Sequence, residues 1–338
     1  MVQLRAPGEL TTEPRPEIAA TLHTTERRVD LGRLLRSGGF TRREVVTNLP
    51  ADQLHVRTFR LPPTAPAERD AAALRHAREG SPFGGEPAHV DVVPVGAARH
   101  GRDERHEYLS FAAREADVRA LLESFGAGIT VRSLQAEPVA LYRAATAAAA
   151  SASTASVHCV VHVGEAETLV LVGEGPTLRV LRRVDVGAAH LDRAASRKLG
   201  VHAGEARRLR CRHAAERDGA DEVRSAVADA TRGLLEVIAR ETALCARYHA
   251  VTFRRELPAS VRLLGFESSN PQLRSLLQNA TGLPIDTQSV FDEFGGNLPP
   301  SDDGTWAGAL GLAMPVARVS VEATADATTQ SAECPSLL

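Results

Sequence analysis

Two patterns of apolar residues alternate along this chain. In residues 54–61, LHVRTFRL, apolar and polar side chains largely take turns, which is the period of a strand with one buried face. In residues 116–125 the apolar side chains instead recur every three or four positions, which predicts an amphipathic helix. Short strand patterns and longer helix patterns follow one another along most of the chain, so the sequence predicts an α/β fold.

The first part of the chain predicts a compact α+β unit over residues 45–134. Its elements come in the order strand, strand, helix, strand, strand, helix, strand. The two middle strands, residues 89–95 and 107–113, predict a hairpin around a charged turn at residues 103–106.

The second part predicts a strand meander followed by helices. Residues 157–172, VHCVVHVGEAETLVLV, hold two runs of branched residues around Gly164, a pattern typical of a buried β-hairpin. Further strands are predicted at residues 178–184, 261–264 and 284–286, and helices up to residue 199 and at 203–213, 221–250, 270–281 and 304–313.

Composition narrows the classes of function. Hydrophobic residues make up 43% of the 338, enough for a sizeable core, and with only 4% aromatics that core must be mostly Ala, Val and Leu. A net charge of −2, from 40 basic and 42 acidic residues, argues against a dedicated nucleic-acid binder. The four cysteines form no CxxC pair, which argues against a zinc site and fits a reducing cytoplasm.

The sequence also predicts that the chain does not span a membrane. Its start is polar and Pro-containing, unlike a signal peptide, and its longest apolar run, residues 144–152, is too short to cross a bilayer. Any membrane association is therefore expected to come through a partner.

Several motifs, taken in order, resemble the type IV pilus assembly protein PilM family. They are FTRREVVTNLP at 40–50, VRTFRLPP at 56–63, a helix at 67–79 that ends before Pro82-Phe83, RRVDVGAAHLDRAASRKLGVHAGEARRLR at 182–210 and WAGALGLAM at 306–314. The resemblance implies an actin-like (ribonuclease H-like) fold of two lobes, related to the cell-division protein FtsA, with a small inserted subdomain.

The resemblance also divides the chain and implies partners. The implied segments are a disordered N-terminus (1–16), a remnant of the first lobe (17–44), the inserted α+β subdomain (45–134), a linking helix (135–156), the second lobe (157–317) and a disordered tail (318–338). Members of the family are cytoplasmic, lie under the inner membrane, bind the cytoplasmic N-terminal tail of a bitopic PilN-type protein, and bind ATP with Mg between their lobes.

Two elements of an actin-like nucleotide site are missing or altered. Residues 1–20 contain no Gly-x-Asp-x-Gly-Ser motif and no convincing strand pair, so the N-terminal phosphate hairpin is predicted to be missing. In the second hairpin Gly164 and Thr168 match the family pattern, but His162 replaces an Asp. A neutral imidazole is a poor ligand for Mg²⁺, so His162 is predicted to be a partly buried strand residue.

The third element is the purine pocket. Glu205 and Arg208 stand three residues apart on one helix, where they either flank an adenosine or form an exposed ion pair. In the turn LLGFESS only Gly265 matches a Gly-rich adenosine turn, and the two residues after it would crowd a nucleotide. No nucleophile and base stand at a recognisable spacing, so we assign no catalytic residue and no metal site.

These observations predict a PilM-like scaffold with a degenerate nucleotide site. Its partner's tail is expected to lie along the strand at 54–61, with Leu54, Val56, Arg57 and Phe59 lining the groove, and self-association is a further expectation. The alternative is an active ATP-binding, ATP-hydrolysing actin-like protein whose start is truncated. A carbohydrate kinase is disfavoured, because no Asp stands in a recognisable Gly-rich setting.

Overall fold

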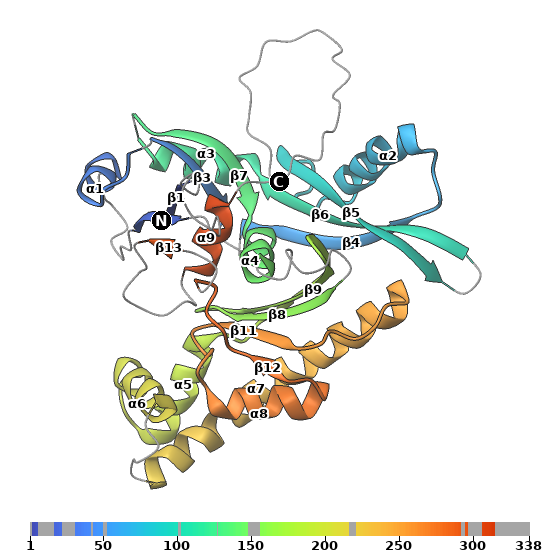
Figure 1. Cartoon of the computed structure of the whole chain (residues 1–338). Coiled ribbons are helices and arrows are strands. Elements are labelled where there is room, and N and C mark those ends of the chain that lie inside the picture. Colours follow the sequence, from blue (N-terminus) through green and yellow to red (C-terminus); the bar gives the residue numbers. More distant parts are fainter. Residues whose placement is uncertain are drawn as a thin grey trace.

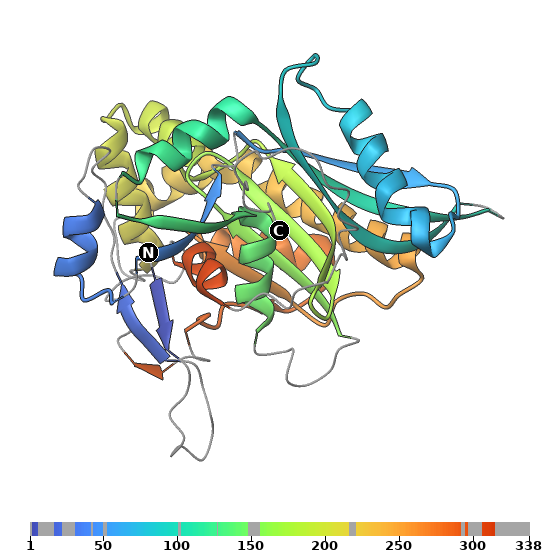
Figure 2. The ribbon, with the colours of Figure 1, turned by 90° about the horizontal axis from the view of Figure 1, so that it is seen from above.

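The computed structural model describes residues 2–5, 17–21, 31–41, 43–49, 53–100, 103–126, 128–147, 156–215, 221–291, 295–296 and 306–314. Within these ranges the chain forms four separate β-sheets with helices packed around them (Figures 1 and 2). Of the segments predicted to be disordered, 1–16 and 318–338, residues 2–5 form a strand, contrary to the prediction, and residues 6–16 and 318–338 lie outside the described residues.

The largest sheet has five strands in the order β10-β9-β8-β11-β12. Strands β8 (Val157–Val163), β9 (Thr168–Glu174) and β10 (Thr177–Val184) form an antiparallel meander, as the sequence predicted. β11 (Val261–Gly265) then runs parallel to β8, and β12 (Ile285–Asp286) runs parallel to β11.

Helices cover both faces of this sheet (Figure 1). On one face lie α4 (Glu137–Thr146) and α9 (Ala307–Ala313), and on the other lie α7 (Asp221–Phe253) and α8 (Pro271–Thr281). This explains why β8, β9 and β11 read as nearly continuous apolar runs, because a strand that is buried on both faces has no solvent side to mark with polar residues.

The first described segments form small strand pairs and one helix, α1 (Leu31–Ser37). β1 (Val2–Arg5) pairs antiparallel with β2 (Glu17–Thr21), and β2 pairs parallel with β13 (Gly295–Gly296). The expectation that residues 1–20 hold no strand pair is therefore wrong. Both strands are short, and a partner of β2 stands far along the chain, so the local pattern gave no signal.

A second pair, β3 (Glu44–Leu49) and β7 (Thr130–Ala136), is parallel. In sequence, β3 precedes and β7 follows the segment that forms the next sheet. α3 (Glu115–Ser124) packs against it, since Val118 joins Leu49 and Leu134 in one small apolar cluster. Between β3 and β7 the chain builds a third sheet, in the order β4-β6-β5.

The third sheet is a long hairpin with one added strand. β5 (Ala88–His100) and β6 (Asp103–Arg114) pair along their whole length, and β4 (His55–Leu61) pairs with β6. The hairpin is confirmed, but the turn predicted at residues 103–106 is wrong, because those residues lie within β6. Charged side chains are compatible with a strand wherever one of its faces is exposed to solvent.

The two faces of this third sheet contact different neighbours. α2 (Pro66–Glu79) covers one face, where Phe59 packs with Ala73, Ala77 and Tyr108. Residues of the other face, such as Leu109, belong to the main core that surrounds the five-stranded sheet. The third sheet is thus packed onto the second half of the chain.

The remaining helices are α5 (Ala188–Leu199) and α6 (Ala203–Ala215), which follow β10. α5 ends at Gly200, whose φ of +68° is a conformation that favours glycine. These helices confirm the predicted order of elements after the meander.

α4 and α9 lie side by side (Figures 1 and 2) and approach each other closely. A Cβ atom placed on Gly311 would overlap the main chain of Ala140. Arg143 of α4 donates hydrogen bonds to the carbonyl oxygens of Gly311 (3.0 Å) and Met314 (3.2 Å) at the end of α9. Glycine at position 311 is therefore required by the contact between the helices.

We predict that Gly311→Ala lowers the free energy of unfolding by about 1–3 kcal/mol, because it overpacks this contact. Gly308→Ala on the same helix is the matched control, since its Cβ would lie 3.8 Å from the side chain of Leu141, an ordinary contact. That variant should be neutral or stabilising by up to about 1 kcal/mol, through helix propensity. Urea denaturation measures both, and equal effects would contradict the close packing.

Candidate functional site

The elements predicted to bind a nucleotide do meet in the structure, at the carboxyl end of β8. The meeting point, which we call the β8 junction, consists of the hairpin turn at residues 164–167, the start of α5, the helix α6 and the turn at residues 266–269. Ala188 and Ala189 donate their backbone N–H groups to the carbonyl oxygens of Gly164 and Glu165, both at 2.9 Å. The N-terminus of α5, which could otherwise attract an anion, is therefore capped by the hairpin turn.

The glycines of the β8 junction are explained by close main-chain packing. Gly265 has a φ of +93°, and a Cβ on it would overlap the main chain of Val163. A Cβ on Gly187 would lie 2.5 Å from the backbone nitrogen of Glu167. The match of Gly164 and Gly265 to a nucleotide-binding pattern thus has a sufficient structural cause.

Thr168 and His162 are also built into the fold. The Thr168 side chain is fully buried, and its hydroxyl donates a 2.6 Å hydrogen bond to the carbonyl oxygen of Val186. His162 is a half-buried residue of β8. Among the residues that the structure describes, no cluster of three or more His, Cys, Asp or Glu could hold a metal ion.

Two carboxylates occupy the hairpin turn, and each is held by an arginine. Glu165 pairs with Arg207 of α6 at 3.3 Å, and Glu167 pairs with Arg183 of β10 at 2.6 Å. The Arg207 guanidinium also lies over the ring of Phe266, 5.1 Å from its centroid. Both carboxylates of the turn are therefore paired with arginines of neighbouring elements.

A buried arginine links three elements of the β8 junction. Arg210 of α6 is only 5% exposed; it donates to Asp192 of α5 at 2.8 Å and to Glu267 of the turn after β11. Burial acts to lower the pKa of Arg210, but the two carboxylates raise it by more, so the guanidinium stays charged. Asn270 donates a 2.6 Å hydrogen bond to Glu267, which completes the pairing of that carboxylate.

The contacts of α6 at the β8 junction are made by residues other than Glu205 and Arg208, whose role in nucleotide binding stays a prediction. Glu205 and Arg208 are exposed, and none of the ion pairs found among the described residues joins them. Arg207 and Arg210 make the contacts instead. Ala206, which is fully buried, marks the inward face of the helix, and Arg210 one turn later shares that face. The small Ala206 was the one signal that could have identified it.

The strand predicted to bind a peptide, β4, is only partly accessible. Leu54 is buried in the main core and its carbonyl oxygen accepts from Arg183, so its side chain cannot contact a partner. Val56 is half-buried against the same core, and Phe59 is buried under α2. Arg57 is exposed. Leu54 is therefore closed to a partner, whereas Arg57 is accessible; the binding of a peptide by these residues stays a prediction.

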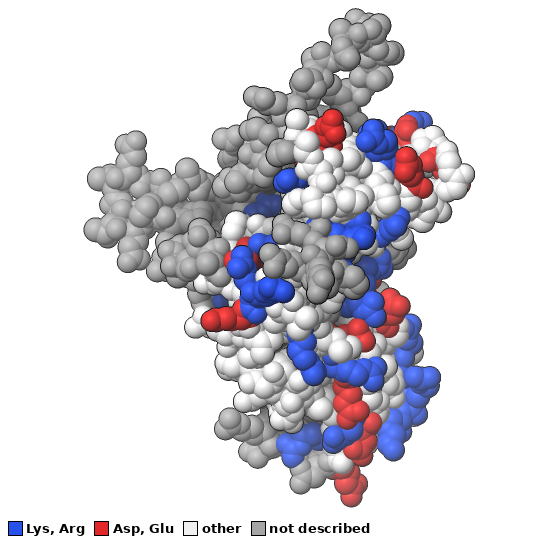
Figure 3. Space-filling view, turned by 90° about the vertical axis from the view of Figure 1, so that its right-hand side faces the viewer, with Lys and Arg blue, Asp and Glu red and all other residues white. Residues whose placement is uncertain are grey.

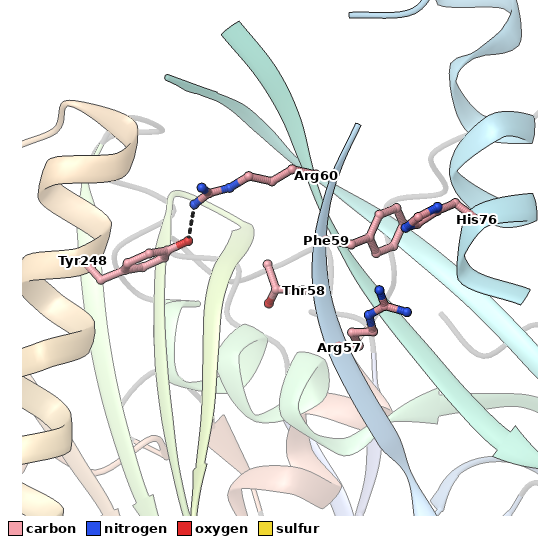
Figure 4. A pocket seen from close by; sticks show the side chains of 6 residues that line it. All are labelled: Arg57, Thr58, Phe59, Arg60, His76 and Tyr248. Atoms are coloured by element: carbon pink, nitrogen blue, oxygen red, sulfur yellow. Dashed lines mark hydrogen bonds between the residues drawn. The ribbon is translucent and has the colours of Figure 1, made fainter. Parts of the chain in front are cut away.

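The structure instead places a hollow beside the middle of β4. It has a volume of about 450 Å³ and is lined by Arg57, Thr58, Phe59, Arg60, His76 and Tyr248 (Figure 4). We call it the β4 hollow. Tyr248 comes from α7, so the β4 hollow lies where the third sheet meets the second half of the chain. No local pattern in the sequence indicated Tyr248.

A small polar network ties β4 to α7. Arg60 donates to the Tyr248 hydroxyl at 2.6 Å and to Glu107 at 2.8 Å, and the Tyr248 hydroxyl donates to Glu107 at 2.9 Å. Burial raises the pKa of Tyr248, and the Glu107 carboxylate raises it further, so the hydroxyl keeps its proton. Glu107 neutralises Arg60, and this leaves Arg57 as the uncompensated arginine of the β4 hollow.

Comparison with known proteins supports the fold. No family model matches the sequence, and no curated protein matches it. In structure the chain is similar to the PilM-PilN type IV pilus biogenesis complex, with a TM-score of 0.70 and 20% identity over 92% of this chain and 93% of that chain. The predicted PilM-like, actin-like fold is confirmed.

Two other solved structures are less similar. Component A of the (R)-2-hydroxyglutaryl-CoA dehydratase from Acidaminococcus fermentans has a TM-score of 0.35 and 17% identity, over 58% of this chain and 71% of that chain. The ethanolamine utilization protein EutJ from Carboxydothermus hydrogenoformans has a TM-score of 0.38 and 16% identity, over 73% of this chain and 97% of that chain. In the part of the chain described here, no helix combines the length and the hydropathy needed to cross a bilayer.

One further carboxyl near the β8 junction has an altered pKa. Burial at the start of α4 raises the pKa of Glu137 to about 7, and the nearby Glu167 carboxylate adds to the shift. Its value in an unfolded chain is about 4.5, so the native state binds this proton more tightly than the unfolded state does. The free energy of unfolding is therefore expected to fall as the pH rises from about 4.5 to about 7, and to stay at the lower value above that.

We predict that Glu137→Gln removes this loss, so that at about pH 8 the variant is more stable than the wild type by about 2–3 kcal/mol. At about pH 4.5 the difference should be small, because Glu137 of the native wild type is then protonated and is as neutral as the Gln of the variant. Urea denaturation across a pH series measures it. Glu115→Gln, at the first position of α3 and more exposed, is the control and should show no such trend; a parallel response would contradict the assignment.

Proposed function

We propose that this chain is a PilM-like cytoplasmic scaffold of a type IV pilus or related secretion machinery. In this proposal it binds the cytoplasmic N-terminal tail of a PilN-type inner-membrane protein and is held at the membrane by that tail. The similar solved structure is a complex of PilM with PilN, and the similarity extends over nearly the whole chain. The observation that carries the proposal is the outer strand β4, which has the β4 hollow beside it.

We further propose that the nucleotide site is degenerate. The chain lacks the Gly-x-Asp-x-Gly motif, and Glu165 and Glu167 stand in the hairpin turn that would contact phosphates. Glu267, in the turn where a nucleoside would lie, is buried against Arg210. These residues do not fit Mg-ATP, because all three carboxylates are paired with arginines of the protein and His162 is a poor ligand for Mg²⁺.

The alternative, an active ATP-hydrolysing actin-like protein, is favoured by one observation. The pair β1–β2 stands at the start of the chain, where an actin-like fold has its first phosphate hairpin. Neither strand contains the Gly and Asp residues of that hairpin. A direct ligand test separates the two proposals.

We expect no change in the thermal midpoint when Mg-ATP is added in large excess. A ligand present at about 100 times its Kd would stabilise the native state by about 2.7 kcal/mol, which a thermal scan detects. Mg-ADP and Mg-GTP serve as parallel arms. A saturable upward shift with Mg-ATP would favour the alternative and would overturn the degenerate site.

We also expect a synthetic N-terminal tail of a PilN-type bitopic protein to bind in calorimetry, and a scrambled tail not to bind. Thr58→Trp should abolish binding, because Thr58 lines the β4 hollow and a large side chain would fill it. Thr130→Trp places the same side chain on an exposed residue of β7 and should leave binding unchanged. Absence of binding by the wild-type, folded protein would refute the partner.

A further inference from the structure

The β4 hollow wraps around the free edge of a strand. β4 pairs with β6 on one side, and no other described strand pairs with it. Along β4, Arg57 and Phe59 point toward α2, whereas Thr58 and Arg60 point toward α7 (Figure 4). Side chains from both faces line the same hollow, which is possible only at the outer edge of a strand. A ligand there would occupy the position of the next strand in the sheet.

The side of the hollow toward α2 carries an uncompensated positive charge. The Arg57 guanidinium donates to the carbonyl oxygen of Gly80 at 3.3 Å, at the C-terminus of α2. None of the ion pairs formed among the described residues involves Arg57. The carbonyl orients the guanidinium without neutralising it, so this side fits a carboxylate.

The side toward α7 carries an exposed row of large apolar side chains next to the polar network of Arg60, Tyr248 and Glu107. Leu244, Tyr248 and Val251 stand on successive turns of one face of α7, and 50%, 40% and 78% of their surfaces are exposed. Tyr248, the middle member, lines the β4 hollow, so this stripe extends along the helix on both sides of that point. An exposed row of large apolar side chains of this kind is typical of a contact surface.

The charges on this side of the molecule also favour an acidic ligand. Figure 3 views the molecule from the side on which α2 and the end of α7 lie, and basic side chains gather across the middle of this face with acidic ones among them. Within the hollow itself the lining includes two arginines and a histidine but no carboxylate. The electrostatic preference is therefore for an anionic segment.

We propose that the edge of β4 binds an extended peptide segment in which acidic and apolar residues alternate. Main-chain hydrogen bonds to β4 would align it as an added strand, and its alternate side chains would then face opposite sides. The acidic residues face Arg57, and the apolar residues face Tyr248 and Leu244. This inference rests on the proposed function in taking the membrane partner's tail as the source of the segment.

The test uses three labelled peptides of equal length and the full chain, with fluorescence anisotropy as the readout. One peptide alternates Glu and Leu, the second has Lys for every Glu, and the third has the Glu and Leu residues grouped in two blocks. We expect the alternating Glu peptide to bind at least about tenfold more tightly than the other two. Only this peptide, when it is paired with β4, places its acidic side chains toward Arg57 and its apolar side chains toward α7. Equal affinity of the three would overturn the proposal.

Two variants locate the binding. Arg57→Glu should weaken the alternating Glu peptide about tenfold, through loss of an ion pair and added repulsion, and should strengthen the Lys peptide. Arg208→Glu, an exposed arginine of α6, is the matched control and should change neither. Leu244→Ser, on the exposed stripe, should weaken the alternating peptide severalfold with folding intact. An unchanged affinity in Arg57→Glu overturns the proposal.

The same variants separate this inference from the proposed function. If the partner's tail binds the wild type and Arg57→Glu equally well, the proposed recognition of acidic residues at the edge of β4 is wrong and the scaffold function stands. If the tail does not bind but the alternating peptide does, and Arg57→Glu weakens that peptide as expected, then the proposed partner is wrong and the proposed recognition at the edge of β4 stands. Slower hydrogen exchange in β4 when the peptide is bound is a second required result; unchanged exchange there would overturn strand addition.

Discussion

Main-chain atoms of separate segments touch at the carboxyl end of β8 with no side chain between them, and much of the second half of the chain depends on this contact. Gly265 lies against Val163, and Gly187 lies against the hairpin turn. Because these backbones are so close, α5 must begin and β11 must end at this point, and the hairpin turn caps α5. α4 and α9 cover one face of the five-stranded sheet and α7 and α8 the other, which buries β8, β9 and β11.

Ion pairs between elements satisfy the charges at this contact. Arg210, Asp192 and Glu267 are buried together, and a buried charge is tolerated only when it is paired and hydrogen-bonded. The pairs of Glu165 with Arg207 and of Glu167 with Arg183 join the hairpin turn to α6 and β10. The protein's own side chains therefore hold the hairpin turn, α5, α6, β10 and the turn after β11 together, and no bound ligand is needed to connect them. The uncompensated Arg57 and the exposed apolar stripe lie elsewhere, beside β4.

The parts of the fold that depend on local patterns were predictable from the sequence. The branched runs of β8 and β9 and the helical spacing of α3 gave these elements directly. β1, β2 and β13 were missed, because each is short and their pairing joins distant segments. The site was predicted less well. Helical spacing alone does not say which face of α6 is inward, so Arg210 was missed. Strand alternation does not say which distant elements pack against β4, so Tyr248 was missed and the burial of Leu54 was not expected.

The pairing of β2 with β13 has a consequence for synthesis of the chain. Glu17 and Ile18 find their partners at Gly295 and Gly296, and α4 also packs against a helix far along the chain, α9. At a ribosomal rate of roughly 5–20 residues per second, these partners emerge on the order of tens of seconds after the strands they complete. Throughout that time one edge of β2 lacks the strand that will cover it. The newborn chain therefore passes through a long interval in which chaperones, or a neighbouring nascent chain, have access to that edge.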